Sequence, residues 1–187
     1  MFLIRDVRAA DLDGLAEVAA HLDSVNLPDD RARLGEIIAA SEASFAGERD
    51  VAERRFVFVL VEAEAGAGAA GPPRESGHVL GTSMIFAQHG TRRAPHVYFD
   101  VREEERYSAT LDKHFIHRVL RIGYNYQGLT EVGGLVLLPE LRRHPAQLGK
   151  LLSYVRFLYL ALHRPIFLDE VVSELMPPLE PDGTSLL

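Results

Sequence analysis

The sequence predicts an α+β fold in which a mixed, mostly antiparallel sheet is flanked by helices on both faces. Two patterns lead to this fold class. Runs of β-branched and aromatic residues follow one another between residues 56 and 138, which is typical of antiparallel strands. A strand, a helix and a last strand then follow, which indicates one parallel crossover. The length of 187 residues, with 47% hydrophobic and 25% charged residues, fits a single globular domain over residues 1–187.

The first elements are one strand and two helices. Phe2–Val7 is predicted as a short strand, and Ala9–Leu22 as a helix because its apolar residues recur at helical spacing. The Leu27-Pro28-Asp29-Asp30 segment ends this part of the chain and starts a second helix over Asp29–Phe45. Gly47 follows as its predicted terminator.

The middle of the chain is predicted to be extended. Phe56–Ala63 and His78–Ala87 form an antiparallel hairpin, and the Gly/Ala/Pro-rich residues 64–77 between them form a flexible loop. His96–Arg102 is a further strand. Phe115–Tyr126 fits a strand or a helix, and its tyrosines and β-branched residues favour the strand.

The last part contains the crossover. Glu131–Leu138 is predicted as a strand that ends at Pro139, and Ala146–His163 as a helix with a leucine-rich buried side. Ile166–Met176 is predicted as the final strand. The tail after Met176 carries no predicted element.

Composition excludes several functional classes. The chain contains no cysteine, so it has no thiolate metal site and no cysteine nucleophile. Its net charge of 20 − 27 = −7 argues against a dedicated nucleic-acid-binding protein. Arg5 and Asp6 follow the first four residues directly, so no signal-peptide core forms, and no segment is apolar enough for a membrane span. We therefore expect a soluble, cytoplasmic protein.

Two motifs invite a functional interpretation that their context does not support. Residues 66–71 spell G-x-G-x-x-G, but Pro72-Pro73 follow where a dinucleotide site needs the start of a helix, which favours a hairpin tip. His114 and His117 are three residues apart. They would share a metal on a helix but face opposite sides of a strand, and no third ligand is evident, so no metal site is predicted.

The most informative region is the strand, basic turn and helix between Leu135 and Leu151. A helix N-terminus offers unpaired N–H groups and a partial positive charge, to which Arg142, Arg143 and Lys150 add full charges. This combination suits a pyrophosphate. The alternative is a solvated turn that happens to carry basic residues.

This arrangement resembles the acyl-CoA-binding core of the Gcn5-related N-acetyltransferase fold. More specifically, the chain resembles the bacterial arginine N-succinyltransferase family over nearly its whole length. The matching stretches include Ile4–Leu12, Val57–Leu60, Gly81–Ser83, Leu135–Leu138 with Arg142-Arg143, and Val172–Leu175. Their order and spacing carry the resemblance.

The sequence also departs from the family pattern. Family members carry an Arg-Arg-Asp-Gly-Asn-Gly turn, whereas here five residues separate Arg142-Arg143 from Gly149, and Pro145 removes a main-chain N–H. Asp100 stands where the family has an arginine, and Gly133-Gly134 replaces a Cys-Thr pair. The resemblance covers the N-terminal half of family members, whose proposed catalytic histidine lies in the other half. We therefore expect the chain to be half of a longer enzyme and to be inactive alone.

The resemblance implies transfer of a succinyl group from succinyl-CoA to the α-amino group of arginine, with no permanently bound cofactor. Its other implied partner is a C-terminal half or an oligomer partner. No catalytic residue is assigned, and Glu131 and Glu174 are either acceptor-binding or solvated carboxylates. Two alternatives remain: an N-acetyltransferase of the same fold acting on another amine, and a non-catalytic acyl-CoA-binding or subunit protein. The implied acyl-CoA contacts are Leu135, Val136, Leu137, Arg142, Arg143, Gly149 and Lys150.

Overall fold

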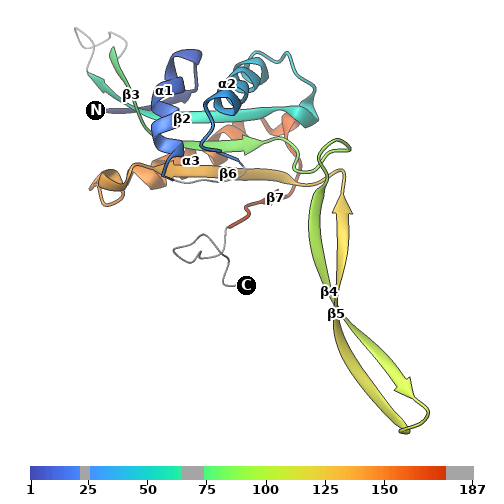
Figure 1. Cartoon of the computed structure of the whole chain (residues 1–187). Coiled ribbons are helices and arrows are strands. Elements are labelled where there is room, and N and C mark those ends of the chain that lie inside the picture. Colours follow the sequence, from blue (N-terminus) through green and yellow to red (C-terminus); the bar gives the residue numbers. More distant parts are fainter. Residues whose placement is uncertain (22–25, 65–73, 176–187) are drawn as a thin grey trace. The chain divides into compact units, whose positions relative to one another are not determined.

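A computed structural model describes residues 1–21, 26–64 and 74–175, which divide into two compact units (Figure 1). The first, called the sheet unit, comprises Met1–Gln88 and Leu129–Leu187. The second, called the hairpin unit, is His89–Gly128. The single domain over residues 1–187 stays a prediction.

The sheet unit is built on five strands in the order β1-β2-β3-β6-β7. All neighbouring strands are antiparallel except β6 and β7, which are parallel and joined through α3, as the predicted crossover requires. The elements are β1 (Phe2–Asp6), α1 (Leu12–Ala19), α2 (Arg31–Phe45), β2 (Arg55–Glu64), β3 (Arg74–Phe86), β6 (Thr130–Leu137), α3 (Leu148–Leu162) and β7 (Val171–Val172). Short 3-10 turns lie at Ala9–Asp11, Val51–Glu53, Pro139–Leu141 and Arg164–Ile166.

Helices cover both faces of the sheet, which confirms the predicted fold class. Figure 1 shows α1 and α2 on one face and α3 on the other. Every residue from Phe56 to Val61 of β2 is buried, as expected for a strand covered on both sides. Val57 and Val59 belong to a core cluster to which α1, α2 and α3 all contribute, and the Phe56 ring lies 4.9 Å from that of Tyr159 of α3.

The second helix begins and ends where its local chemistry dictates. The Asp30 carboxylate accepts hydrogen bonds from the main-chain N–H groups of Ala32 (2.9 Å) and Arg33 (3.1 Å), which caps the helix start. Gly47 adopts φ +78°, the left-handed conformation that commonly ends a helix. The predicted terminator is thus confirmed.

The predicted last strand, Ile166–Met176, is largely wrong. Only Val171 and Val172 pair with β6, and Ile166 belongs to a 3-10 turn. The apolar character of this segment serves packing instead, because Phe167 is buried and its ring lies 5.6 Å from that of Phe56. Met176 lies outside the described residues.

The loop predicted over residues 64–77 is only partly described. Residues 65–73, including the G-x-G-x-x-G segment, lie outside the described residues. Arg74–Gly77 belong to β3, and Arg74 pairs with Glu64. The predicted loop is therefore wrong for Glu64 and Arg74–Gly77, whereas the prediction that a strand rather than a helix follows the glycine motif is confirmed.

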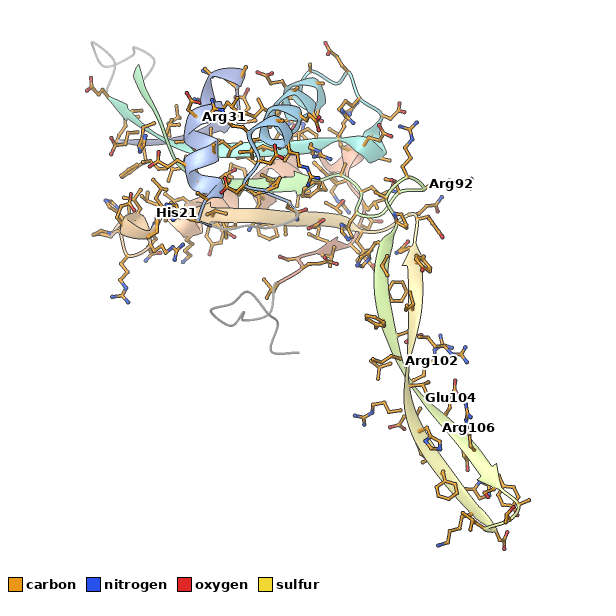
Figure 2. All side chains as sticks on the ribbon, viewed as in Figure 1. His21, Arg31, Arg92, Arg102, Glu104 and Arg106 are labelled. Atoms are coloured by element: carbon orange, nitrogen blue, oxygen red, sulfur yellow. The ribbon has the colours of Figure 1, made fainter. Side chains whose placement is uncertain are left out.

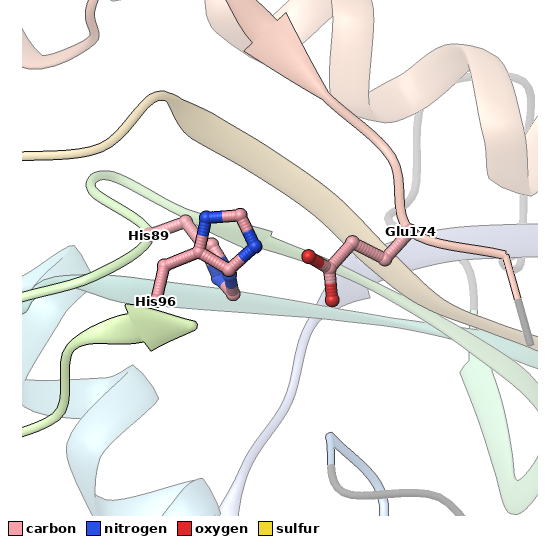
Figure 3. A group of neighbouring side chains, drawn as sticks. All are labelled: His89, His96 and Glu174. Atoms are coloured by element: carbon pink, nitrogen blue, oxygen red, sulfur yellow. The ribbon is translucent and has the colours of Figure 1, made fainter. Parts of the chain in front are cut away.

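The hairpin unit contains β4 (His96–Ser108) and β5 (Lys113–Asn125), which pair only with each other. The predicted strand over Phe115–Tyr126 is thus confirmed as part of β5. His114 and His117 of β5 lie on opposite faces of the hairpin. The prediction of a single sheet was wrong, because these two strands form a sheet of their own. Near their base, the rings of His89 and His96 lie 4.3 Å apart, edge to face (Figure 3).

No described helix is long and apolar enough to cross a membrane: the longest, α2 and α3, have 15 residues each.

A buried ion pair fixes the start of the chain against the first helix. Both oxygens of the Asp11 carboxylate accept hydrogen bonds from the Arg5 guanidinium, at 2.7 and 2.8 Å, and the Arg8 N–H donates a third. Asp11 is 2% exposed. Burial acts to raise the pKa of Asp11, but the bonds from Arg5 and Arg8 outweigh it, so the pKa lies below 3.8.

Removing this carboxylate is expected to destabilise the fold and to change its acid sensitivity. Asp11→Ala removes the carboxylate that pairs with the largely buried Arg5 guanidinium, and breaking such a pair typically costs about 3 kcal/mol in the free energy of unfolding. Because the pKa is lower in the folded state, the contribution of Asp11 is complete above about pH 4 and is lost as pH falls toward the folded-state pKa. Urea unfolding between pH 3 and 7 checks both points. An equal pH dependence in wild type and variant would contradict them.

Candidate functional site

Strand β6 has one edge that is only briefly paired. On its other edge, the Leu138 N–H bonds to the Leu80 carbonyl (3.0 Å), and Val136 lies opposite Thr82. Because main-chain groups alternate in direction along a strand, the N–H and C=O of Leu135 and Leu137 face away from β3. On that side β7 pairs only with Thr130 and Glu131, and no other described strand continues the pairing.

A β-bulge interrupts β6 at the same place. The register with β3 shifts between Thr82 and Met84, so β6 carries one extra residue at Gly134–Leu135. Gly134 adopts φ +55°, and a Cβ on it would lie 2.7 Å from Met84 Cγ. Only glycine fits this position without strain. The bulge leaves Leu135 42% exposed within an otherwise largely buried strand.

Helix α3 is hydrogen-bonded to β6 next to the bulge through the side chain of Arg156. The guanidinium of Arg156, which is 5% exposed, donates to the Gly133 carbonyl (3.3 Å) and to Ser153 Oγ (2.9 Å). Burial lowers the pKa of Arg156 below its usual value. A buried arginine therefore ties the helix to the strand at Gly133, the residue just before the bulge.

The turn between β6 and α3 is held by its own side chains. Arg142 Nε donates to the Leu137 carbonyl (3.3 Å), and His144 Nδ1 accepts from the Ala146 N–H (3.1 Å). The His144 ring lies 5.1 Å from that of Phe2, edge to face. Gln147, just before α3, adopts φ +52°, a conformation that is uncommon for a residue other than glycine. The turn is thus longer and more internally bonded than a glycine-rich one.

The start of α3 leaves main-chain donors available. The N–H groups of Lys150 and Leu151 bond to the Gln147 carbonyl. Within the described residues, no hydrogen bond is formed by the N–H groups of Leu148 and Gly149, which belong to the first turn of the helix. The Lys150 ammonium lies 5.5 Å from the centre of the Tyr154 ring. This end of the helix therefore combines donors with positive charge.

Two pockets along the strand and the turn share Arg142 and Gly149 in their linings. One has a volume of 290 Å³ and follows the open edge of β6; the other has a volume of 500 Å³ and lies over the turn. The structure places all seven residues expected to contact acyl-CoA in these linings. The first pocket is lined by His21, Leu135, Val136, Leu137, Arg142 and Gly149. The second is lined by Arg142, Arg143, His144, Pro145, Gln147, Gly149 and Lys150.

Sequence reasoning missed His21 as part of this surface. It follows the end of α1 and lines the β6 pocket, and Figure 2 shows it at the end of that helix. No local pattern marks it, because its proximity to β6 arises only from folding. His144, Pro145 and Gln147 belong to the predicted turn, so their presence was implied by it.

The two carboxylates considered as acceptor ligands have different environments. Glu174 is exposed. Glu131 is 3% exposed and accepts a hydrogen bond from Asn26 Nδ2 (2.8 Å), so the solvated alternative is wrong for it. A Cβ on Gly133 would lie 3.2 Å from Glu131 Oε1 and 2.9 Å from Asn26 Nδ2. The glycine at this position thus allows the pair to lie directly beside the bulge.

Comparison with known proteins agrees with this geometry. The family model described as arginine N-succinyltransferase beta subunit matches residues 2–187. The chain is 29% identical to arginine N-succinyltransferase subunit beta of Pseudomonas aeruginosa, covering 98% of this chain and 50% of the relative. It is 30% identical to subunit alpha of the same organism, covering 99% and 52%.

Solved structures show the same fold. The arginine/ornithine succinyltransferase subunit AI from P. aeruginosa superimposes with a TM-score of 0.79 at 30% identity, covering 98% of this chain and 52% of that chain. The loading GNATL domain of CurA from Lyngbya majuscula, at 16% identity, shares the fold with a TM-score of 0.51, covering 97% and 68%. The chain spans about half the length of the curated relatives that it matches. With its family model matched over residues 2–187, the chain belongs to the arginine N-succinyltransferase family.

Proposed function

We propose that this chain binds succinyl-CoA on strand β6, the turn after it and the start of α3, together called the β6–α3 unit. We further propose that it takes part in transferring the succinyl group to the α-amino group of arginine. The observation that carries the proposal is the open, bulged edge of β6 leading directly into a basic turn and a helix N-terminus. Family membership supplies the substrates, because relatives of this chain are named arginine N-succinyltransferase.

The two pockets match the two chemically different parts of CoA. The pantetheine arm carries amide groups, which pair with the outward main-chain groups of Leu135 and Leu137 as a further strand would. The pyrophosphate is dianionic. It lies over Arg142, Arg143 and Lys150, with the N–H groups at the start of α3. Arg142 connects the two parts, since it lines both pockets and bonds to the Leu137 carbonyl.

The bulge is the place where chemistry would occur. A neutral amine attacks the thioester carbonyl, the carbonyl oxygen gains negative charge, and CoA leaves as its thiolate while the amine gives up a proton. The Leu135 N–H, directed to the open edge, is suited to donate to the developing oxyanion, since such preorganised donors contribute several kcal/mol. The buried carboxylate of Glu131 lies beside the bulge, four residues before Leu135. It is suited to attract a cationic acceptor.

Calorimetry and a thiol-release assay test the proposal together. Titration of the chain with succinyl-CoA, acetyl-CoA and free CoA is expected to show binding of all three, with succinyl-CoA the tightest. Arginine-dependent release of thiol is then measured for the chain alone and with a candidate partner subunit. Tighter binding of acetyl-CoA would favour an acetyltransferase of the same fold. Binding without thiol release under any condition would favour a non-catalytic acyl-CoA-binding protein.

A further inference from the structure

The paired strands β4 and β5 have two chemically distinct faces. Side chains on a strand alternate between faces, so cross-strand partners share one. Val97 lies opposite Tyr124, Phe99 opposite Ile122, and Val101 opposite Leu120. These six residues form one continuous surface, called here the apolar face: Val97, Phe99, Val101, Leu120, Ile122 and Tyr124.

The apolar face is open to solvent. Each of its six side chains is between 53% and 64% exposed. At about 100 Å² of exposed surface each, the face presents on the order of 600 Å², which is large for an uncovered patch on a soluble protein. No residue of β4 or β5 is buried, so the hairpin has no hydrophobic core of its own. A two-stranded hairpin of this kind is at best marginally stable alone.

The opposite face carries charged pairs along β4, with Tyr98 and Phe115 as its exposed aromatic side chains. Figure 2 shows Arg102, Glu104 and Arg106 following one another along β4. Arg102 pairs with Asp100 (2.6 Å), and Glu104 accepts from Arg121 of β5 (2.8 Å) and from Arg106 (3.4 Å). The bonds from Arg121 and then Arg106 lower the pKa of the Glu104 carboxyl. The hairpin is therefore amphipathic, with one face suited to water and the other to an apolar surface.

Charges at the end of the apolar face indicate what covers it. Glu103 of β4 and Arg118 of β5 follow directly on the same face, 3.7 Å apart and both largely exposed. If two copies meet face to face with a two-fold axis parallel to the strands, β4 of one copy lies over β5 of the other. Glu103 of each copy then meets Arg118 of the second copy, and the apolar pairs are matched in the same way.

The antiparallel alternative lacks this match. An axis across the strands would lay β4 over β4 of the second copy, centred on Phe99. Glu103 would then meet Pro95 rather than a cation, while the apolar residues would still be covered. Charge complementarity thus selects the parallel arrangement. The buried surface of about 600 Å² per copy, with these ion pairs added at its end, approaches the roughly 800 Å² per partner of a standard interface.

We propose that the apolar face is the interface between two copies of this chain, which pair through their β4–β5 hairpins in parallel around a two-fold axis. The proposal is independent of the acyl-transfer function, because it concerns residues outside the β6–α3 unit and is tested by molecular mass.

Analytical ultracentrifugation of the whole chain provides the first test. We expect a dimer at micromolar concentration, and a dissociation constant at least 100-fold higher for Phe99→Lys, which places a charge in the centre of the apolar face. Phe115→Lys is the matched control, because Phe115 lies on the charged face of the same hairpin. It should leave the dissociation constant within about threefold. A wild-type chain that is monomeric at about 100 μM, or equal effects of the two variants, would overturn the proposal.

A charge exchange tests the parallel arrangement. Glu103→Arg alone and Arg118→Glu alone each place like charges opposite each other in the dimer and are expected to weaken it at least tenfold. An equimolar mixture of the two variants restores both ion pairs across the interface, so a heterodimer should form with nearly wild-type affinity. A mixture that associates no better than either variant alone would rule out the parallel arrangement.

Discussion

Substituting both turn arginines, Arg142→Ala with Arg143→Ala, is expected to weaken CoA binding by about 5- to 150-fold. Charge-assisted hydrogen bonds to phosphate are typically worth about 1–3 kcal/mol, and Arg142 also holds the Leu137 carbonyl at the edge of the strand. The loss should therefore include part of the pantetheine arm as well as the pyrophosphate. Calorimetric titration with CoA measures it.

The control variant changes the net charge by the same amount, but at residues away from the proposed CoA site. Arg31→Ala with Arg33→Ala also removes two positive charges, but from the first turn of α2, where Arg31 is 61% exposed. This variant should bind CoA within about twofold of wild type. Equal weakening in both double variants would mean that CoA responds to overall charge. An unchanged dissociation constant for the turn variant would make the turn a solvated surface.

The second large effect is expected at the bulge. Gly134→Val introduces a β-branched residue at φ +55° and brings its Cβ to 2.7 Å from Met84 Cγ. Left-handed backbone strain and overpacking together are expected to lower the free energy of unfolding by roughly 3 kcal/mol. Because the strain is relieved by shifting β6 against β3, the affinity for succinyl-CoA should also fall by on the order of tenfold, as the open edge of β6 loses its geometry.

A matched glycine separates this effect from a general one. Gly35 lies in α2 with ordinary helical φ, and a Cβ added to it would meet no heavy atom within 4 Å, so Gly35→Ala should stabilise the chain slightly. Urea unfolding compares the two substitutions. The milder Gly134→Ala keeps a folded chain available for titration if the valine variant does not fold. A stability for Gly134→Val equal to that of wild type would show that the bulge does not depend on glycine.

The strand, turn and helix of the site could be predicted because their signals are local. Pro139 marks the end of β6, and the leucine spacing after Gln147 marks α3. The seven expected contacts come from one continuous stretch of chain, so placing that stretch placed them together. His21 could not be predicted, since its position at β6 depends on how α1 packs on the sheet.

The errors concern pairing, which periodicity does not determine. β4 and β5 were predicted as strands, but alternation within a strand does not say whether it joins the main sheet. The apolar residues of Ile166–Met176 indicated a strand, whereas Phe167 packs on the aromatic cluster and only two residues pair. The glycine pair Gly133-Gly134 was a sequence signal for the bulge. The comparison with the family pattern noted it only as a replacement of a Cys-Thr pair.

Hydrogen exchange with and without succinyl-CoA tests most directly whether the β6–α3 unit is the acyl-CoA site. At saturating ligand, the main-chain N–H groups between Leu135 and Leu151 are expected to exchange more slowly, because the open edge of β6 becomes paired and the start of α3 gains phosphate acceptors. The hairpin unit and α2 should be unchanged. Protection confined to any other part of the chain, or binding with no change between Leu135 and Leu151, would contradict the assignment of acyl-CoA to this strand and turn.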